Sequence, residues 1–218
     1  KIDTSLNYYG TVINAQTLEH AVPNLRNSVE KIIVIENKAN YESMEYDPKV
    51  LYIFCHGYFS PKEVRFLQML MKTAPEEIPV HCVNLSTKGE QEKQLFVFTR
   101  EQEQHSECSY TDTLGNYLYE PNASLLKAGA FRSIAAAYSA KKLHPNSHLY
   151  TSDTQIEGFP GRTFRIINRC SLNKKEIKEN LSDLKKANIT VRNFPATVAE
   201  LRKRIKLAEG GDTYLFAS

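Results

Sequence analysis

The chain lacks several features that would assign it to a class of protein at once. No stretch of the sequence approaches the ~20 consecutive apolar residues that a bilayer-spanning helix needs. Its four cysteines form no Cys-x-x-Cys pair, which disfavours a zinc site or a disulfide framework and favours a reducing compartment. The first ten residues have no apolar core of the signal-peptide type. These absences predict a cytoplasmic protein with no membrane partner.

Motifs of catalysis and cofactor binding are also missing. The sequence contains no P-loop, no Gly-x-Gly-x-x-Gly loop for a nucleotide, no Ser-His-Asp arrangement and no Asp-x-Asp pair. His144 and His148 have the spacing of a helical zinc pair, but Pro145 lies between them and is incompatible with that helix. We therefore expect no metal site, no cofactor site and no catalytic residue from these patterns.

Charge is present but unevenly distributed along the chain. The net charge is +3, yet residues 159–218 alone carry 13 Lys and Arg against 6 Asp and Glu. The rest of the chain carries 15 against 19. A basic C-terminal segment thus follows an acidic remainder, and a folded basic surface of this kind most naturally meets phosphate.

The basic segment has the pattern of a small folded domain. Capping boxes that begin at Asn173 and Thr197 predict helices over 174–185 and 198–207. Short β-rich runs flank these helices: 163–167, 188–193 and 213–217. We predict a three-strand, two-helix α/β unit over residues 159–218.

Several basic residues are candidates for binding a nucleic acid. Arg162 and Arg192 each lie beside a Pro-containing turn that could fix the side chain. For the Arg202–Lys206 cluster, a solvated helix face is as good an explanation as phosphate contact. Both arginines are expected to be exposed charges, so replacing both with alanine should change stability by about 0.5 kcal/mol at most. The candidate nucleic-acid-binding set is Lys142, Arg162, Arg165, Arg192, Asn193, Arg202, Lys203 and Arg204.

The N-terminal segment reads as an α/β layer. Residues 31–35 and 50–54 are β-rich apolar runs, and Ser60 followed by Pro61 predicts the start of a helix. Glu36 follows the first run, at the strand end where α/β sheets place chemistry. A solvated or capping carboxylate explains Glu36 more often than a catalytic one does.

The middle segment alternates strands and a helix. Residues 80–85 and 94–99 are strand candidates, and the polar residues 101–112 suggest a loop. An apolar stripe predicts a helix from Pro121 to about residue 140. Gly129 lies among small residues of that helix, which suggests close packing against a neighbour.

Two stretches of the N-terminal segment resemble a known family. Residues 34–41 (VIENKANY) and 54–63 (FCHGYFSPKE) are similar to the toprim nuclease subunit of the Wadjet plasmid-defence system, over roughly residues 10–72. The resemblance implies that Glu36 would hold Mg²⁺ together with a downstream Asp-x-Asp pair. The chain has no such pair, so a fragment of a metal-dependent toprim DNA nuclease is an alternative hypothesis.

A second resemblance covers about residues 80–218. It rests on several motifs, among them YLYEPNASLLKAGAF (117–131), KLHPNSHLYTS (142–152), FPGR (159–162), RNFP (192–195) and GGDTYLF (210–216). These resemble the C-terminal part of a Bacteroidetes-type class I S-adenosylmethionine-dependent methyltransferase. The resemblance implies a ferredoxin-like domain near 80–155 and a THUMP-like, RNA-binding domain near 159–218. The family's catalytic domain, with its Gly-rich cofactor loop, precedes this part, and no such loop occurs here.

Together these observations predict a mixed α/β (α+β) protein. We expect a partial α/β segment over 1–74, a ferredoxin-like domain over 80–155 and a basic THUMP-like domain over 159–218. The first hypothesis is a module that binds structured RNA (tRNA or rRNA) and serves a methyltransferase domain in cis or in trans. S-adenosylmethionine is implied for the whole family protein but not for this chain. Besides the nuclease fragment, a scaffold that binds an acidic protein is a further alternative.

Overall fold

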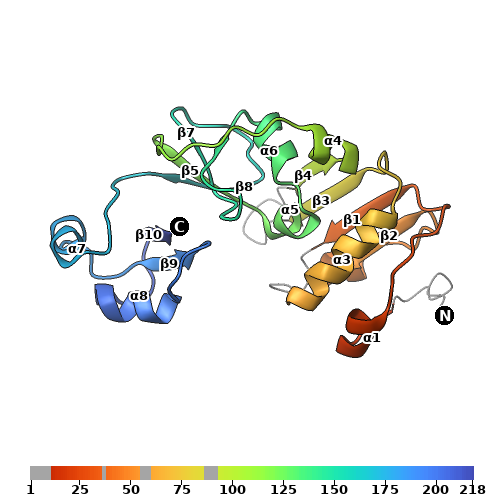
Figure 1. Ribbon diagram of the computed structural model, residues 1–218, viewed down its shortest axis with the longest axis horizontal. Helices are drawn as coiled ribbons and strands as arrows, with labels where there is room; N and C mark the ends of the chain where they lie inside the picture. The colour runs from red at the N-terminus through yellow and green to blue at the C-terminus, as the bar shows by residue number, and fades with distance from the viewer. Residues whose placement is uncertain (1–10, 36–37, 55–59, 86–92) are drawn as a thin grey trace. The chain divides into compact units, whose positions relative to one another are not determined.

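The computed structural model describes residues 11–35, 38–54, 60–85 and 93–218, and its elements are drawn in Figure 1. The chain divides into two compact units. Residues 1–108 and 121–137 form the first unit, and residues 109–120 and 138–218 form the second. The candidate Glu36 lies outside the described residues.

A four-stranded sheet is the core of the first unit. Its order is β2-β1-β3-β4, with β1 (Lys31–Ile35) parallel to both β2 (Val50–Phe54) and β3 (Val80–Leu85). The last strand, β4 (Lys93–Phe98), runs antiparallel to β3. The apolar runs that predicted these strands become buried, since Ile32 and Val80 are each at most 1% exposed. The predicted strands of this segment are confirmed.

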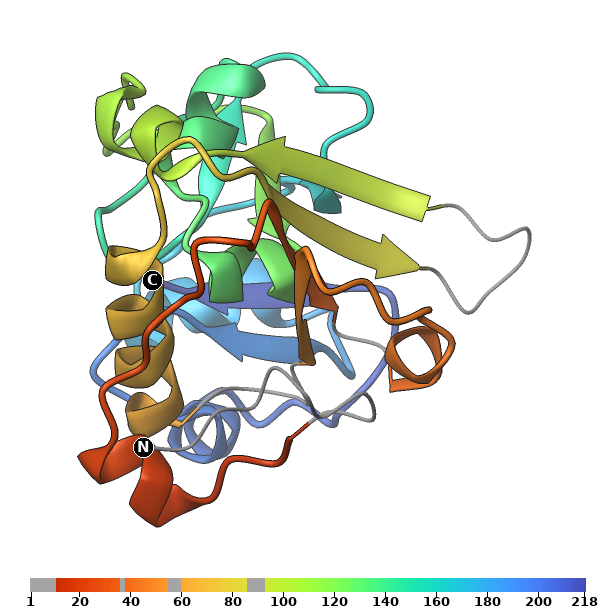
Figure 2. The same ribbon diagram turned by 90° about the vertical axis from the view of Figure 1, so that its right-hand side faces the viewer.

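Helix α3 (Pro61–Thr73) begins as its sequence predicts. The Ser60 hydroxyl accepts a hydrogen bond from the Glu63 backbone N–H at 3.3 Å, and the Glu63 carboxylate accepts one from the Ser60 N–H at 2.6 Å. Figure 2 shows α3 and α2 (Lys38–Glu42) on opposite sides of the sheet. Helix α1 (Ala15–His20) packs beside α3. The unit is therefore a layered α/β structure.

The first unit continues past the expected domain boundary at residues 74–80. Because β3 pairs with β1 along four residues, residues 80–98 complete the N-terminal sheet. Arg100 holds the connection, donating to the carbonyl oxygens of Met71 at 2.8 Å and Ala74 at 3.3 Å. It also forms an ion pair with Glu76 at 2.8 Å. Residues 75–79 are thus a fixed turn inside one unit.

The polar stretch expected to be a loop contains a helix instead. Helix α4 (Arg100–His105) begins with a capping box between Thr99 and Gln102. The carboxylate of Glu103 on this helix accepts hydrogen bonds from three successive backbone N–H groups at 2.7–3.0 Å, those of residues 131–133. It thereby caps the start of helix α6 (Arg132–Ala137), whose N–H groups would otherwise lack partners.

The prediction of one long helix from Pro121 onwards is wrong. Pro121 ends strand β5 (Tyr117–Pro121), and two short helices follow, α5 (Ala123–Ala128) and α6. Gly129 separates them with a φ of +81°, a left-handed conformation that ends α5. A side chain at Gly129 would meet nothing within 4 Å, so its role is conformational and the predicted close packing is not found.

The second unit contains a four-stranded sheet in the order β6-β7-β5-β8. Its strands besides β5 are β6 (Lys141–Lys142), β7 (Tyr150–Ser152) and β8 (Gly161–Arg165). Tyr119 and Tyr150 are fully buried, and their ring centroids lie 4.9 and 6.3 Å from that of Phe159. This aromatic group forms the core of the sheet.

Two further strands and two helices complete the second unit. β9 (Asn188–Val191) and β10 (Tyr214–Ala217) pair in parallel, and α8 (Val198–Ile205) packs on β9. Helix α7 (Lys174–Leu181) begins at the predicted cap, Asn173. Both predicted helices and all three predicted strands of 159–218 are present. The strand β8, however, pairs in the four-stranded sheet and not with β9 and β10.

Candidate nucleic-acid interface

A buried carboxylate organises two of the predicted site residues. Glu120 lies on β5 and is 4% exposed. Arg162 on β8 donates from Nε to Glu120 Oε2 at 3.0 Å and also from Nη2 to the same oxygen. Arg192, directly after β9, donates from Nη2 to Glu120 Oε1 at 2.5 Å. The structure therefore brings Arg162 and Arg192 together on one acidic side chain that sequence reasoning did not identify.

The two arginines differ in what they can still offer a ligand. The side chain of Arg162 is 50% exposed, and the described residues provide no hydrogen-bond partner for its Nη1. The side chain of Arg192 is 21% exposed, and its Nη1 donates to the carbonyl of Val191 at 3.2 Å. Arg162 can thus hold Glu120 and a phosphate at once, whereas Arg192 is mainly part of the framework.

This geometry changes the stability that we expected for the arginine pair. A carboxylate taken out of water is stable only when it is paired, and removing its partners costs several kcal/mol. The alanine replacements expected to be nearly neutral would leave Glu120 buried and unpaired. We therefore replace that expectation, which treated both arginines as isolated surface charges, with a destabilising one.

Lys142 is not positioned to meet a polyanion. The residue is 2% exposed, its ammonium group donates to the carbonyl of Pro145, and it lies 6.0 Å from the centroid of the Tyr110 ring. Burial therefore corrects the role predicted for Lys142, which is structural. Asn193, another predicted site residue, has a φ of +52° and lies with its Nδ2 3.1 Å from Nδ1 of His144.

His148 is held neutral by its surroundings. Burial, and to a smaller extent the nearby charges of Lys142 and Arg192, lower its pKa from 6.5 to about 4. The ring is therefore uncharged near pH 7. Sequence reasoning considered this histidine only as half of a zinc pair.

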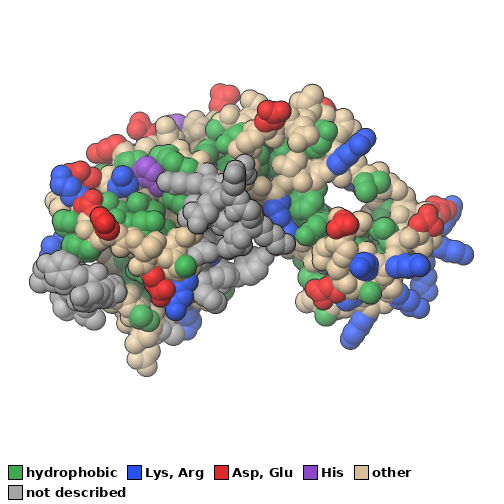
Figure 3. All heavy atoms as spheres, turned by 180° about the vertical axis from the view of Figure 1, so that it is seen from behind, with side chains coloured by type: hydrophobic (Ala, Val, Ile, Leu, Met, Phe, Trp, Pro, Cys, Tyr) green, Lys and Arg blue, Asp and Glu red, His purple; other side chains and the backbone are tan. Residues whose placement is uncertain are grey.

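The basic cluster on α8 divides into anchored and exposed side chains. Arg202 donates from Nη1 to the carbonyl of Leu207 at 3.3 Å and lies 4.0 Å from the Glu209 carboxylate, so it secures the end of the helix. Lys203 and Arg204 are exposed, as is Arg165 on β8. Figure 3 shows Lys and Arg side chains projecting from the part of the chain that carries α7 and α8. Besides Arg162, the exposed cationic candidates are thus Arg165, Lys203 and Arg204.

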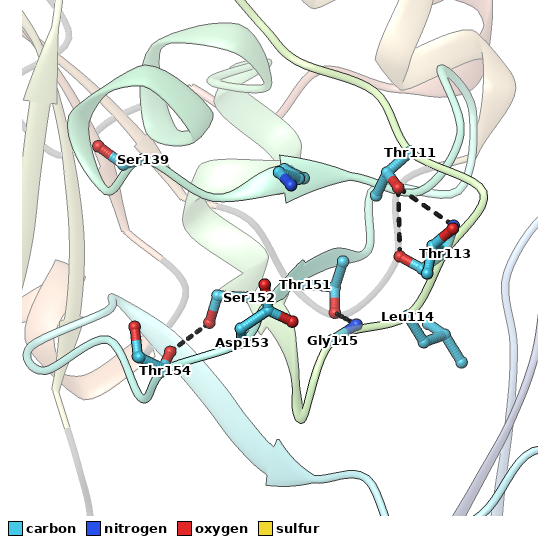
Figure 4. A pocket seen from close by; sticks show the side chains of 10 residues that line it. Thr111, Thr113, Leu114, Gly115, Ser139, Thr151, Ser152, Asp153 and Thr154 are labelled. Atoms are coloured by element: carbon cyan, nitrogen blue, oxygen red, sulfur yellow. Dashed lines mark hydrogen bonds between the residues drawn. The ribbon is translucent and has the colours of Figure 1, made fainter.

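A polar pocket of about 390 Å³ lies elsewhere in the second unit (Figure 4). Most of its lining residues carry hydroxyl groups, and several of these groups bond to neighbouring protein atoms. Thr151 Oγ1, for example, accepts from the Gly115 N–H at 2.9 Å and donates to the Tyr117 carbonyl at 2.8 Å. The lining holds one carboxylate, Asp153, and one ammonium group, Lys141. This arrangement offers no activated nucleophile.

Two kinds of feature are absent from the described part of the chain. No three His, Cys, Asp or Glu side chains there come together as metal ligands would. No helix within the same residues is both long and apolar enough to cross a bilayer.

Comparison with known proteins defines the two C-terminal domains. Residues 117–160 match a ferredoxin-like domain family, and residues 161–218 match a THUMP domain-like family. The chain is also similar to the crystal structure of a candidate methyltransferase from Porphyromonas gingivalis W83, with 41% identity and a TM-score of 0.57. The match covers 65% of this chain and 34% of that one, so the chain spans about a third of that protein's length. No curated protein matches the chain.

These matches bear on the two resemblances differently. The mixed α/β class and the ferredoxin-like and THUMP-like domains are confirmed. The ferredoxin-like match begins at residue 117, whereas we expected that domain from residue 80. The toprim resemblance of residues 10–72 stays a prediction, and Glu36, its only proposed ligand here, lies outside the described residues.

The buried carboxylate predicts a stability change. Replacing Arg162 and Arg192 with alanine should lower the free energy of unfolding by roughly 3 kcal/mol, because Glu120 would remain buried without a partner. Adding Glu120→Gln should restore at least half of the loss. Urea unfolding measured by circular dichroism checks both expectations. The matched control, K174A/K175A on α7, removes two exposed cations and should change stability by about 0.5 kcal/mol at most.

The depressed pKa of His148 predicts a pH effect. The folded state disfavours the charged ring. The contribution of His148 to folding stability is therefore complete above pH 6.5 and is lost as the pH falls from 6.5 through about 4. His148→Asn removes the titration and tolerates the left-handed backbone at φ +52°. The wild type should therefore lose roughly 1–2 kcal/mol more than the variant over this range, allowing for partial solvent exposure. If the free energy of unfolding changed with pH equally in the wild type and in His148→Asn, the lowered pKa of His148 would be contradicted.

Proposed function

We propose that this chain is the RNA-binding part of an S-adenosylmethionine-dependent RNA methyltransferase and that it does not transfer methyl groups itself. The observation that carries the proposal is the coincidence of the THUMP-like match with the basic segment. Residues 161–218 carry all 13 Lys and Arg of that segment against 6 Asp and Glu. Domains of the THUMP type bind RNA, and phosphate is the ligand that such a surface attracts.

The methyltransferase association rests on the solved structure. That protein is named as a candidate methyltransferase, and this chain matches about a third of its length at 41% identity. The sequence here has no Gly-rich cofactor loop. A catalytic domain would then act in cis or in trans, with this chain holding tRNA or rRNA for it. S-adenosylmethionine would belong to that catalytic domain.

The exposed cations predict how salt affects RNA affinity. Each phosphate contact releases counterions, so the logarithm of the binding constant falls as the logarithm of the salt concentration rises. Each contact contributes about −0.9 to that slope on B-DNA and less on single strands. Lys203→Ala with Arg204→Ala should remove about two contacts and flatten the slope by roughly 1.5 units. Titration of a structured tRNA at several salt concentrations measures this.

The control for that titration is Lys174→Ala with Lys175→Ala. These residues lie on α7 of the same domain, and Lys175 already lies 4.0 Å from Glu179. We expect this pair to leave the slope nearly unchanged. Equal flattening by both pairs would indicate a general charge effect, and no RNA binding by any form would favour an acidic protein as the partner.

The absence of a cofactor loop predicts the behaviour of the chain towards small ligands. Isothermal calorimetry with S-adenosylmethionine should give no binding at micromolar concentrations. The chain alone should likewise not cleave DNA with Mg²⁺, because Glu36 has no Asp-x-Asp partner in the sequence. Micromolar binding of the cofactor would overturn the proposal that catalysis belongs to another domain.

A further inference from the structure

Three aromatic side chains cluster on the surface of the second unit. Phe164 lies on β8, and its ring centroid is 4.9 Å from those of both Tyr214 and Phe216 on β10. Tyr214 and Phe216 are two residues apart on the strand and so face the same side. Tyr214 is 36% exposed, and the other two are half-buried. We call Phe164, Tyr214 and Phe216 the aromatic platform.

A fixed cation adjoins the aromatic platform. The guanidinium carbon of Arg162 lies 5.3 Å from the centroid of Phe164 and 5.1 Å from that of Tyr214. Glu120 holds this guanidinium through Nε and Nη2, and Nη1 has no hydrogen bond within the described residues. The guanidinium therefore lies over the two rings, which places a charged group that can bind phosphate next to the ring surface that stays exposed for stacking.

Core packing does not account for the exposure of Tyr214. A tyrosine used only for packing is normally buried, with its hydroxyl bonded to a partner. Within the described residues, the Tyr214 hydroxyl has no hydrogen bond, and more than a third of the residue meets solvent. Exposed aromatic rings beside an arginine are the means by which proteins bind unstacked bases.

We propose that the aromatic platform and Arg162 form a binding site for an unpaired nucleotide of RNA. The base stacks on Tyr214, and Nη1 of Arg162 donates to the adjacent phosphate. The domain's excess of positive charge complements the backbone on either side of this nucleotide. The inference rests on the proposed RNA-binding function and adds that part of the bound RNA is single-stranded. An acidic peptide would use the same cation but would gain nothing from ring stacking.

The test compares two variants of Tyr214 on two RNAs. Fluorescence anisotropy measures binding of the full chain to an oligoadenosine of about eight nucleotides, a length within the range that such sites occupy, and to a blunt RNA duplex. Tyr214→Leu should weaken binding to the single strand about ten-fold, whereas Tyr214→Phe, which keeps the ring, should stay within about two-fold. Affinity for the duplex should change less than about two-fold in either variant, because its bases are already stacked.

A second measurement leaves the protein unchanged. An abasic strand of the same length keeps the phosphates but offers no base, so the wild type should bind it about ten-fold more weakly. Equal affinity for both strands, or an equal loss on strand and duplex in Tyr214→Leu, would overturn the stacking site while RNA binding stands. If no form of the chain binds RNA at low salt, the proposed function and this inference fail together.

Discussion

The second unit depends on one buried ionic interaction, that of Glu120 with Arg162 and Arg192. The carboxylate is 4% exposed, and burial of a charge is tolerated only where opposite charges and hydrogen bonds replace the lost water. Arg162 approaches from β8, and Arg192 from the residue after β9. Glu120 belongs to the ferredoxin-like match and both arginines to the THUMP-like match. One carboxylate therefore joins the two domains.

This interaction also decides which cations remain for a ligand. Arg192 and Lys142 bind protein atoms in partly or fully buried positions, and Arg202 secures the end of α8. Lys203 and Arg204 are exposed on the last turn of the same helix. A count of basic residues therefore overestimates the number of phosphate contacts. The salt dependence of binding follows the exposed subset.

Local signals were enough to predict many of the elements. Short strand-forming runs predicted β1, β2 and β3. The cap at Ser60, followed by Pro61, and the capping box at Thr197 predicted α3 and α8, because these features act within a few residues. The box at Thr99 was also in the sequence, but its polar surroundings suggested a loop. The helix break at Gly129 is not predicted, because the apolar stripe continues across it. The residue that caps the following helix α6, Glu103, lies about thirty residues earlier in the chain.

The site was harder to predict than the fold because its contacts are distant in sequence. Glu120 is 42 residues from Arg162 and 72 from Arg192, and beside Pro121 it reads as an ordinary turn residue. The expected boundary near residue 74 failed for the same reason, since only the pairing of β3 with β1 places residues 80–98 in the first sheet. The sequence composition alone predicts the basic segment. Only the structure shows which of its cations bind protein atoms and which are exposed to a ligand.

Anchoring changes what Arg162 can contribute to binding. A free arginine loses rotamer freedom when it binds a phosphate, and that loss weakens affinity. In this chain, Glu120 already restricts the side chain in the folded state, so less freedom remains to be lost on binding. The carbon of the planar guanidinium also lies 5.1 Å from the centroid of the Tyr214 ring, where cation and stacking surface can act on adjacent parts of one nucleotide. Glu120 thus neutralises part of the domain's positive charge, but by restricting Arg162 it lowers the entropy that this arginine loses when it binds a phosphate.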